Sequence, residues 1–343
     1  NNTGSLEIVV SANDGSPTST AMILDANSRI SLSNNDAGTD NTVFGFMAGA
    51  ALNSDGVENT LIGDYAGTAI TTGDYNTAVG KNALPSEDVG QSSTAIGYSA
   101  LGSQNTVNQS HVNNVGVGVN TGYYNGTGTN NTWLGSNAGV GASGQSNSNN
   151  TAVGSNSLLA VTTGSANTSI GKDSSKALTD GHNNVAIGNN ALETSTSVGY
   201  VVAIGDDAMK SGVVTADADG SIAIGGSALN ALTSGQYNIA IGYNSMDEHT
   251  TGRANTCLGW GTMSQSGGDT TAQDNTFIGA SSGGGDWAGA GVDQNTAVGY
   301  ATMTGAMTDS NHNSAFGAHA LEALTEGDNN TAIGARALND VTT

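Results

Sequence analysis

The chain of 343 residues is poor in the residues that usually build a thick globular core. It holds one cysteine and two prolines, and aromatic residues make up 5% of it, whereas glycine alone fills 51 positions. The lone Cys257 excludes an intrachain disulfide framework. So few aromatic side chains cannot fill a conventional core. A chain this polar would normally be disordered unless a strict pattern of apolar residues imposes order.

Positive charge is scarce as well. Lys and Arg number 7 against 29 Asp and Glu, which gives a formal net charge of −22. Nucleic acid and anionic membranes bind basic surfaces, so the composition predicts neither as a partner. No apolar run approaches the roughly 20 residues of a membrane helix, and we expect no membrane insertion by this part of the chain. The acidic residues leave one neutral stretch, because none lies between Asp88 and Asp173.

What the chain has in abundance is a repeat. The stretch NIAIGYNSM at 238–246 has near-copies such as NTAVGKNAL at 76, NVAIGNNAL at 184 and NTAIGARAL at 330. The copies align on the glycine after the apolar pair: Gly45, Gly63, Gly80, Gly97, Gly118, Gly135, Gly154, Gly171, Gly188, Gly205, Gly225, Gly242, Gly259, Gly279, Gly299, Gly317 and Gly334. Most neighbours are 17 residues apart and the others 18 to 21. A period this regular is typical of stacked architectures.

Each unit of the repeat fixes the residue type at several positions. The residue before the glycine is always large and apolar, as in Ile187 and Ile241, and the residue two before it is usually small. Asparagine stands four before the glycine in most units, as in Asn184 and Asn238. A β-branched run that ends at glycine predicts a short strand. We expect a glycine turn, a second short strand and a return loop to follow it.

The repeat therefore predicts an all-β fold, a parallel β-solenoid or β-roll of about 17 coils of about 17 residues. Neighbouring copies would pair in register, with the asparagines forming a ladder along the stack. Both strand faces carry apolar or small residues, which one thin coil cannot bury. We therefore expect a homotrimeric fibre with the strands near its axis. Residues 1–40 are assigned to an N-terminal β connector segment and 41–343 to the repeat domain, which we expect to continue beyond the C-terminal end.

The letters of the repeat also resemble those of two known families. The cores NTAVG at 76–80 and NVAIG at 184–188 are similar to the head repeats of trimeric autotransporter adhesins, which fold as a trimeric left-handed parallel β-roll. The longer form, in which AL is followed by TTG and NTAIG, looks more like repeat regions of bacteriophage tail fibres. Residues 17–45 are similar to segments that precede such regions. The resemblance implies an extracellular homotrimer on a virion tail or a bacterial cell surface.

Two classes of function follow from these observations. The first is a structural and adhesive fibre, a phage tail fibre shaft that presents binding surfaces for a host receptor, either a glycan or a protein. A bacterial cell-surface adhesin passenger is the alternative within this class. The second class is an enzyme, a glycan-degrading tailspike, which needs carboxylates in a groove and long loops. Because the coils are uniform and their insertions short, we predict binding without catalysis.

The candidate glycan contacts are aromatic residues outside the strands. Trp260 directly follows a repeat glycine, and Tyr123, Tyr124 and Trp287 lie in loops. An exposed aromatic face offers a large apolar surface on which a sugar ring can stack. The alternative interpretation is that each of these rings shields the edge of a coil. Cys257 occupies the small position two before its glycine and is interpreted as a core thiol.

The acidic loops also raise the question of calcium. Segments 266–275 and 283–294 carry Asp269, Asp274, Asp286 and Asp293. Carboxylate and carbonyl oxygens are the ligands that calcium prefers, and these four residues are the candidate ligands. The glycine-rich nonapeptide of calcium-binding β-rolls is absent, so no cofactor is expected in the repeat core. A metal on the axis of an oligomer would leave no signature in the sequence.

Overall fold

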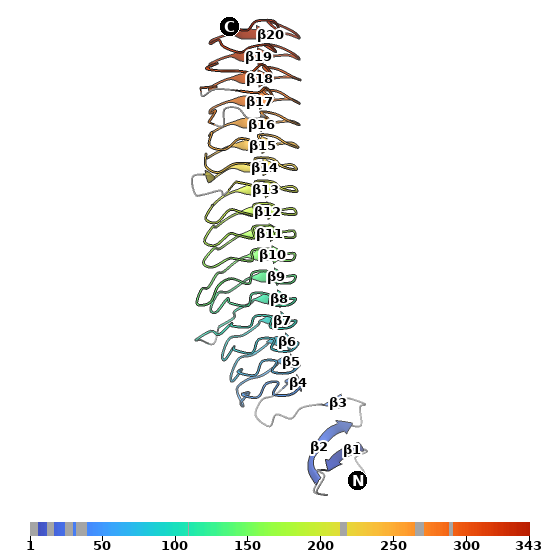
Figure 1. Ribbon diagram of the computed structural model, residues 1–343. Coiled ribbons are helices and arrows are strands. Elements are labelled where there is room, and N and C mark those ends of the chain that lie inside the picture. Colours follow the sequence, from blue (N-terminus) through green and yellow to red (C-terminus); the bar gives the residue numbers. More distant parts are fainter. Residues whose placement is uncertain are drawn as a thin grey trace. The chain divides into compact units, whose positions relative to one another are not determined.

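The computed structural model describes residues 6–11, 17–24, 30–31, 40–108, 110–212, 218–264, 271–287 and 291–343. The fold is all-β, a parallel β-solenoid of about 16 turns spaced about 17 residues apart, with no α-helix in these ranges (Figure 1). The predicted fold class is therefore confirmed, whereas the homotrimer stays a prediction. The chain divides into two compact units, residues 1–131 and 132–343.

The first unit contains two kinds of β-sheet. An antiparallel sheet consists of β1 (Leu6–Ser11), β2 (Pro17–Leu24) and β3 (Ile30–Ser31). A parallel sheet follows, in which each strand pairs with the next: β4 (Thr42–Phe44), β5 (Thr60–Ile62), β6 (Thr77–Val79), β7 (Thr94–Ile96) and β8 (Val115–Val117). The change from antiparallel to parallel pairing falls between β3 and β4, next to the expected start of the repeat at residue 41.

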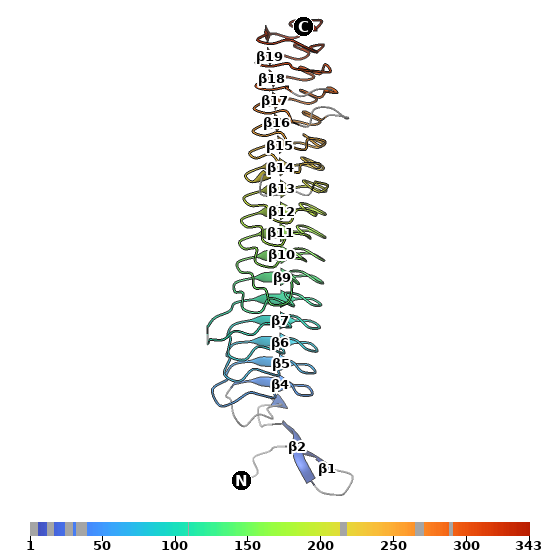
Figure 2. The same cartoon turned by 60° about the vertical axis from the view of Figure 1, so that its left-hand side comes forward.

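The second unit consists of parallel strands alone, stacked one above another (Figures 1 and 2). They are β9 (Thr132–Leu134), β10 (Thr151–Val153), β11 (Thr168–Ile170), β12 (Val185–Ile187), β13 (Val202–Ile204), β14 (Ile222–Ile224), β15 (Ile239–Ile241), β16 (Thr256–Leu258), β17 (Thr276–Ile278), β18 (Thr296–Val298), β19 (Ser314–Phe316) and β20 (Thr331–Ile333). The strands pair in register, so that equivalent repeat positions lie side by side, as Ala186 and Ala203 do and Ile187 and Ile204.

The interior of most coils is filled by a pair of residues whose sizes are complementary. The middle residue of the strand points inward and is buried, and it faces the residue four after the repeat glycine. Ala186 is paired in this way with Leu192, both wholly buried. Where the strand residue is large, as in Leu61, the partner is a glycine, and a Cβ at Gly67 would lie 2.6 Å from the Leu61 side chain. Coils with such a pair thus keep a similar filled volume, as close packing requires.

The segment after the repeat glycine is not the second strand that the sequence suggested. It is a turn in which residues two and four after the glycine have positive φ, 55° at both Asn190 and Leu192. This conformation costs about 1–2 kcal/mol for a residue other than glycine. The backbone N–H groups of these two residues donate to the carbonyls of Lys172 and Ala208 on the two neighbouring coils. These hydrogen bonds between coils offset the cost.

The repeat glycines are required by both conformation and space. Gly188 has φ of 142° and Gly242 has φ of 139°, a region that side chains rarely allow. A Cβ at Gly188 would lie 2.2 Å from the carbonyl oxygen of Gly205 in the next coil. Any other residue at this position would therefore push neighbouring coils apart.

The predicted asparagine ladder is present and is saturated with hydrogen bonds. The Nδ2 group of Asn184 donates to Oδ1 of Asn167 at 3.0 Å and to the carbonyl of Val198 at 2.7 Å. Its Oδ1 accepts the backbone N–H of Val201 at 3.0 Å. In the same way Asn238 donates to the carbonyl of Gly252 at 2.7 Å, and its Oδ1 accepts from the next asparagine. One buried amide thus joins the strand, the return loop and the neighbouring coils.

A glutamine side chain makes the hydrogen bonds of the ladder in a coil that lacks the asparagine. Ser93 takes the place of the asparagine in its coil, and Gln104 stands in the next coil seven residues after the repeat glycine, where Glu87 stands one coil earlier. Nε2 of Gln104 donates to Oγ of Ser93 and to Oε2 of the buried Glu87, both at 2.9 Å. Oε1 of Gln104 accepts from Nδ2 of Asn114 at 2.9 Å. Gln104 therefore keeps the hydrogen bonding continuous through the core.

Candidate binding surfaces

The outer face of the strands is an uncharged surface with a continuous row of apolar side chains. In the unit 132–343 the residue before each repeat glycine lies on this face, where Leu134, Ile170, Leu258 and Phe316 are 37–45% exposed. Ile187 and Ile241 are half-buried at the same position. The other outward residue of each strand is Thr, Val, Ile or Ser, so neither row carries a charge. Contiguous apolar surface of this kind marks interaction sites in soluble proteins.

Trp287 does not belong to the surface, contrary to its place among the candidate glycan contacts. Its side chain is wholly buried, and the centroid of its ring lies 5.6 Å from that of Phe277. The return loop turns this apolar residue into the interior, where burial of its large area is favourable. Trp287 is therefore a core residue in this fold.

Tyr123 and Tyr124 lie together on a turn of the first unit. Their rings meet edge to face, with centroids 4.7 Å apart and planes at 88°. The half-buried ring of Tyr123 covers Gly102 of the preceding coil, where an added Cβ would lie 2.5 Å from it. Tyr124 is 37% exposed. Tyr123 shields the coil edge, as the alternative interpretation expected, and glycan binding by the pair stays a prediction.

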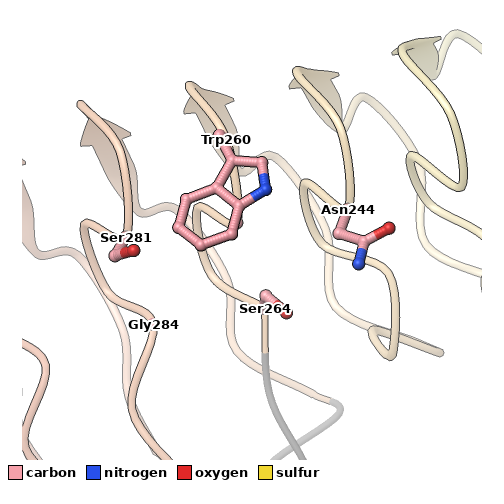
Figure 3. A pocket seen from close by; sticks show the side chains of 6 residues that line it. Asn244, Trp260, Ser264, Ser281 and Gly284 are labelled. Carbon is pink, nitrogen blue, oxygen red and sulfur yellow. The ribbon is translucent and has the colours of Figure 1, made fainter.

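Trp260 is the exposed aromatic candidate that borders a recess. Its side chain is 59% exposed, and it lines a recess of about 220 Å³ together with Asn244, Gly261, Ser264, Ser281 and Gly284. Figure 3 shows the indole between Ser281 on one side and Asn244 on the other, with Ser264 below it. None of the six lining residues is charged. The recess spans three successive coils, and none of its residues belongs to a strand.

Two glycines create this recess, and sequence reasoning overlooked them. Gly261 stands two after its repeat glycine, where Asn244 stands in the coil before and Ser281 in the coil after. A Cβ at Gly261 would meet no atom within 4 Å. Gly284 stands at the position that Ser264 takes one coil earlier. The signal in the sequence is a glycine at a repeat position that elsewhere carries a side chain.

The acidic candidates for calcium are used in different ways. Asp293 is a rung of a second ladder, in which its Oδ1 accepts the backbone N–H of Gln273 at 2.9 Å and its backbone N–H donates to Oδ1 of Asn311 at 2.9 Å. Asp274 holds a turn conformation with φ of 58°, and Asp286 is exposed. Asp269 lies outside the described residues. No group of three metal-binding side chains occurs in the described ranges, and calcium binding stays a prediction.

Charged groups elsewhere are engaged in surface contacts. A hydrogen bond from Asn190 lowers the pKa of Asp207, and the neighbouring Lys210 lowers it further, while partial burial opposes both effects. The carboxyl of Asp207 lies 2.9 Å from Nδ2 of Asn190 and 3.0 Å from Nζ of Lys210.

Burial raises the pKa of the Cys257 thiol well above its ordinary value. Cys257 is wholly buried, with its Sγ 3.5 Å from Sδ of Met263, which confirms a core thiol.

Comparison with protein-family models finds no match to this chain, and comparison with curated proteins finds none either. No helix in the described ranges is long and apolar enough to span a membrane. What the protein does must therefore be inferred from its own residues and their geometry.

Proposed function

We propose that this chain is the shaft of an extracellular homotrimeric fibre, of the kind found in bacteriophage tails, that presents binding surfaces to a host-cell glycan. The observation that carries the proposal is the apolar outer face of the strands. It repeats in every coil of the second unit, and its large side chains remain 37–45% exposed at Leu134, Ile170, Leu258 and Phe316. A water-facing parallel sheet with this composition needs a cover.

A second and a third copy of the same chain are the cover that fits best. Strands lie about 4.8 Å apart along a stack, so a partner that contacts every coil must repeat at the same spacing. Another copy of this chain has the same strand spacing, because it has the same repeat. The strand face carries no charge, so the net charge of −22 does not set like charges against each other there. Cyclic symmetry closes such an assembly and leaves the acidic turns outside.

Binding without catalysis is part of the same proposal. The buried carboxylate of Glu87 accepts hydrogen bonds from the backbone of Gly90 at 2.9 Å and the hydroxyl of Thr106 at 2.8 Å, and so supports the fold. Asp293 is used in the same way within its ladder. A hydrolase would need carboxylates facing a bound sugar, whereas the recess at Trp260 is lined by uncharged residues.

The test is the mass of the purified chain in solution. We expect multi-angle light scattering to give three chains per particle and electron micrographs to show rods. A stable monomer would overturn the fibre. Adhesion is tested separately, by binding of the purified protein to immobilised glycans, and release of reducing sugar during that assay would contradict the absence of catalysis.

A further inference from the structure

The recess at Trp260 differs from the corresponding surface of other coils in having no side chain at two positions. In the other described coils the position of Gly261 carries a side chain, most often asparagine. The position of Gly284 is also glycine in one other coil, at Gly102, and there the ring of Tyr123 fills the space. In the described chain, only the recess at Trp260 combines an exposed indole with glycine at both positions, and an added Cβ would meet open space at Gly261.

The polar groups around the indole are available to a ligand. The side chains of Asn244, Ser264 and Ser281 make no hydrogen bond within the described chain, and all three are half-buried at the recess. An amide offers two donors and an acceptor, and a hydroxyl offers a donor and an acceptor. A small number of placed polar groups around an apolar face is the usual composition of a small-molecule site.

The geometry points to a subsite for one uncharged sugar ring, a neutral hexose or N-acetylhexosamine of a glycan, stacked on Trp260. This inference rests on the proposed adhesive function. A sugar ring has one apolar face, which suits the indole, and a rim of hydroxyls, which suits Asn244, Ser264 and Ser281. The volume of about 220 Å³ is below the range of sites that enclose drug-sized ligands, about 300–1,000 Å³, so it admits a single ring. A charged sugar would find no counter-charge among the six lining residues.

The subsite and the trimer contact do not compete for the same residues. All six lining residues lie on turn segments, whereas the proposed contact uses the outward residues of the strands. A trimer would present the recess three times. Each ring would be bound weakly, and the assembly would gain avidity from simultaneous contacts.

The test compares three variants of the full chain on an array of neutral, sialylated and sulfated glycans. Trp260→Ala removes the stacking surface. Gly261→Asn fills the recess with the residue most common at this position, and asparagine already adopts this φ at Asn244. The control is Tyr243→Ala, since Tyr243 is 58% exposed at the equivalent position one coil earlier but does not line the recess. Saturation-transfer NMR with methyl glucoside, methyl galactoside and methyl N-acetylglucosaminide provides the second readout.

We expect the wild type and Tyr243→Ala to bind neutral glycans equally, and Trp260→Ala and Gly261→Asn to lose at least tenfold in affinity. Wild-type binding by Gly261→Asn would overturn the subsite, and so would binding of charged glycans only or of no glycan. These outcomes are distinct from failure of the proposed fibre, which is judged by the mass of the same preparations. A trimer that binds glycans independently of Trp260 would remove the subsite and leave the adhesive fibre standing.

Discussion

Asparagine serves at two positions of the repeat for two different reasons. At the ladder position the short amide reaches two neighbouring coils and the return loop from a buried site, as Asn184 does. In the turn, asparagine stands at Asn190 because it adopts positive φ more readily than most residues. Only a polar side chain can supply the hydrogen bonds of the first position, and the ladder is interrupted where Val201 stands there. Leu192 shows that the second conformation is open to an apolar residue when neighbouring coils hold it.

The ladder position predicts a large effect of a small substitution. Asn184→Ala removes three buried hydrogen bonds and leaves the carbonyl of Val198 and the N–H of Val201 without their partner. We expect a loss of about 3 kcal/mol in the free energy of unfolding, measured by urea denaturation. The matched control is Asn183→Ala, an exposed neighbour with φ of 57° whose position is held by alanine at Ala166. Equal stability of the two variants would contradict a supporting role for the ladder.

The carboxyl of Asp207 predicts a pH-dependent contribution to stability. Its native pKa lies below the ordinary value of 3.8, chiefly through the hydrogen bond from Asn190. A lowered carboxyl pKa stabilises the fold above that ordinary value, and the contribution disappears as the pH falls through the native pKa. We expect Asp207→Asn to cost at most about 1 kcal/mol at pH 7, as for an exposed ion pair. The cost should decrease as the pH falls below 3.8 and vanish once Asp207 is protonated in the folded chain, and a cost that stays constant from pH 7 down through this range in urea titrations would refute the assignment.

At the scale of one coil, size is conserved by pairs of residues that lie six apart in the sequence. A large strand residue is matched by glycine across the interior, as Leu61 is by Gly67. A small strand residue is most often matched by leucine or methionine, as Ala223 is by Leu229, both wholly buried. Ser169, which is paired with Ser175, is an exception. Where the sizes are matched, the two residues therefore act as a pair, and the effect of a substitution at one of them on stability depends on the size of the other.

This pairing predicts compensation between two substitutions. Leu61→Ala alone leaves a cavity and should cost about 2–5 kcal/mol. Gly67→Leu alone should overpack the coil and cost about 1–3 kcal/mol. The double variant recreates the arrangement of Ala223 and Leu229. Its loss in free energy of unfolding should therefore be about 1–3 kcal/mol smaller than the sum of the losses of the two single variants. Thermal or urea unfolding of the four proteins measures this coupling, and strict additivity would show that the two residues do not share one space.

The sequence predicted the parts of the coil that repeat without change. The short strands follow from the apolar residues before each repeat glycine, and the ladder follows from the asparagine four positions before it. Both features are predicted by the sequence. The turn after Gly188 was mistaken for a strand, because the positive φ of Leu192 depends on hydrogen bonds to neighbouring coils. Trp287 was assigned to the surface, since nothing in one sequence shows which way a loop residue turns. The recess was missed because its residues come from three coils.

At the scale of the whole molecule, one period governs the folding of the chain and would also govern the proposed assembly. Because each coil contacts chiefly its neighbours, stability is a sum of local interfaces, and no single coil fills more than a thin interior. The apolar strand face repeats with the same period, so any partner that covers it must match the spacing of the strands. The proposed trimer therefore uses the property that already holds the single chain together.

The strand face predicts that one charge can separate assembly from folding. Ile241 is half-buried on the outer face of β15, where an aspartate would stay hydrated in a single chain but would be buried and unpaired between copies. We expect light scattering to show Ile241→Asp as a monomer that keeps the β-type circular dichroism of the wild type. Ser211→Asp, which places the same charge on an exposed loop residue, should remain a trimer. A trimeric Ile241→Asp would show that the copies meet through another surface, since three unpaired carboxylates cannot be accommodated in an apolar contact without a large loss of affinity.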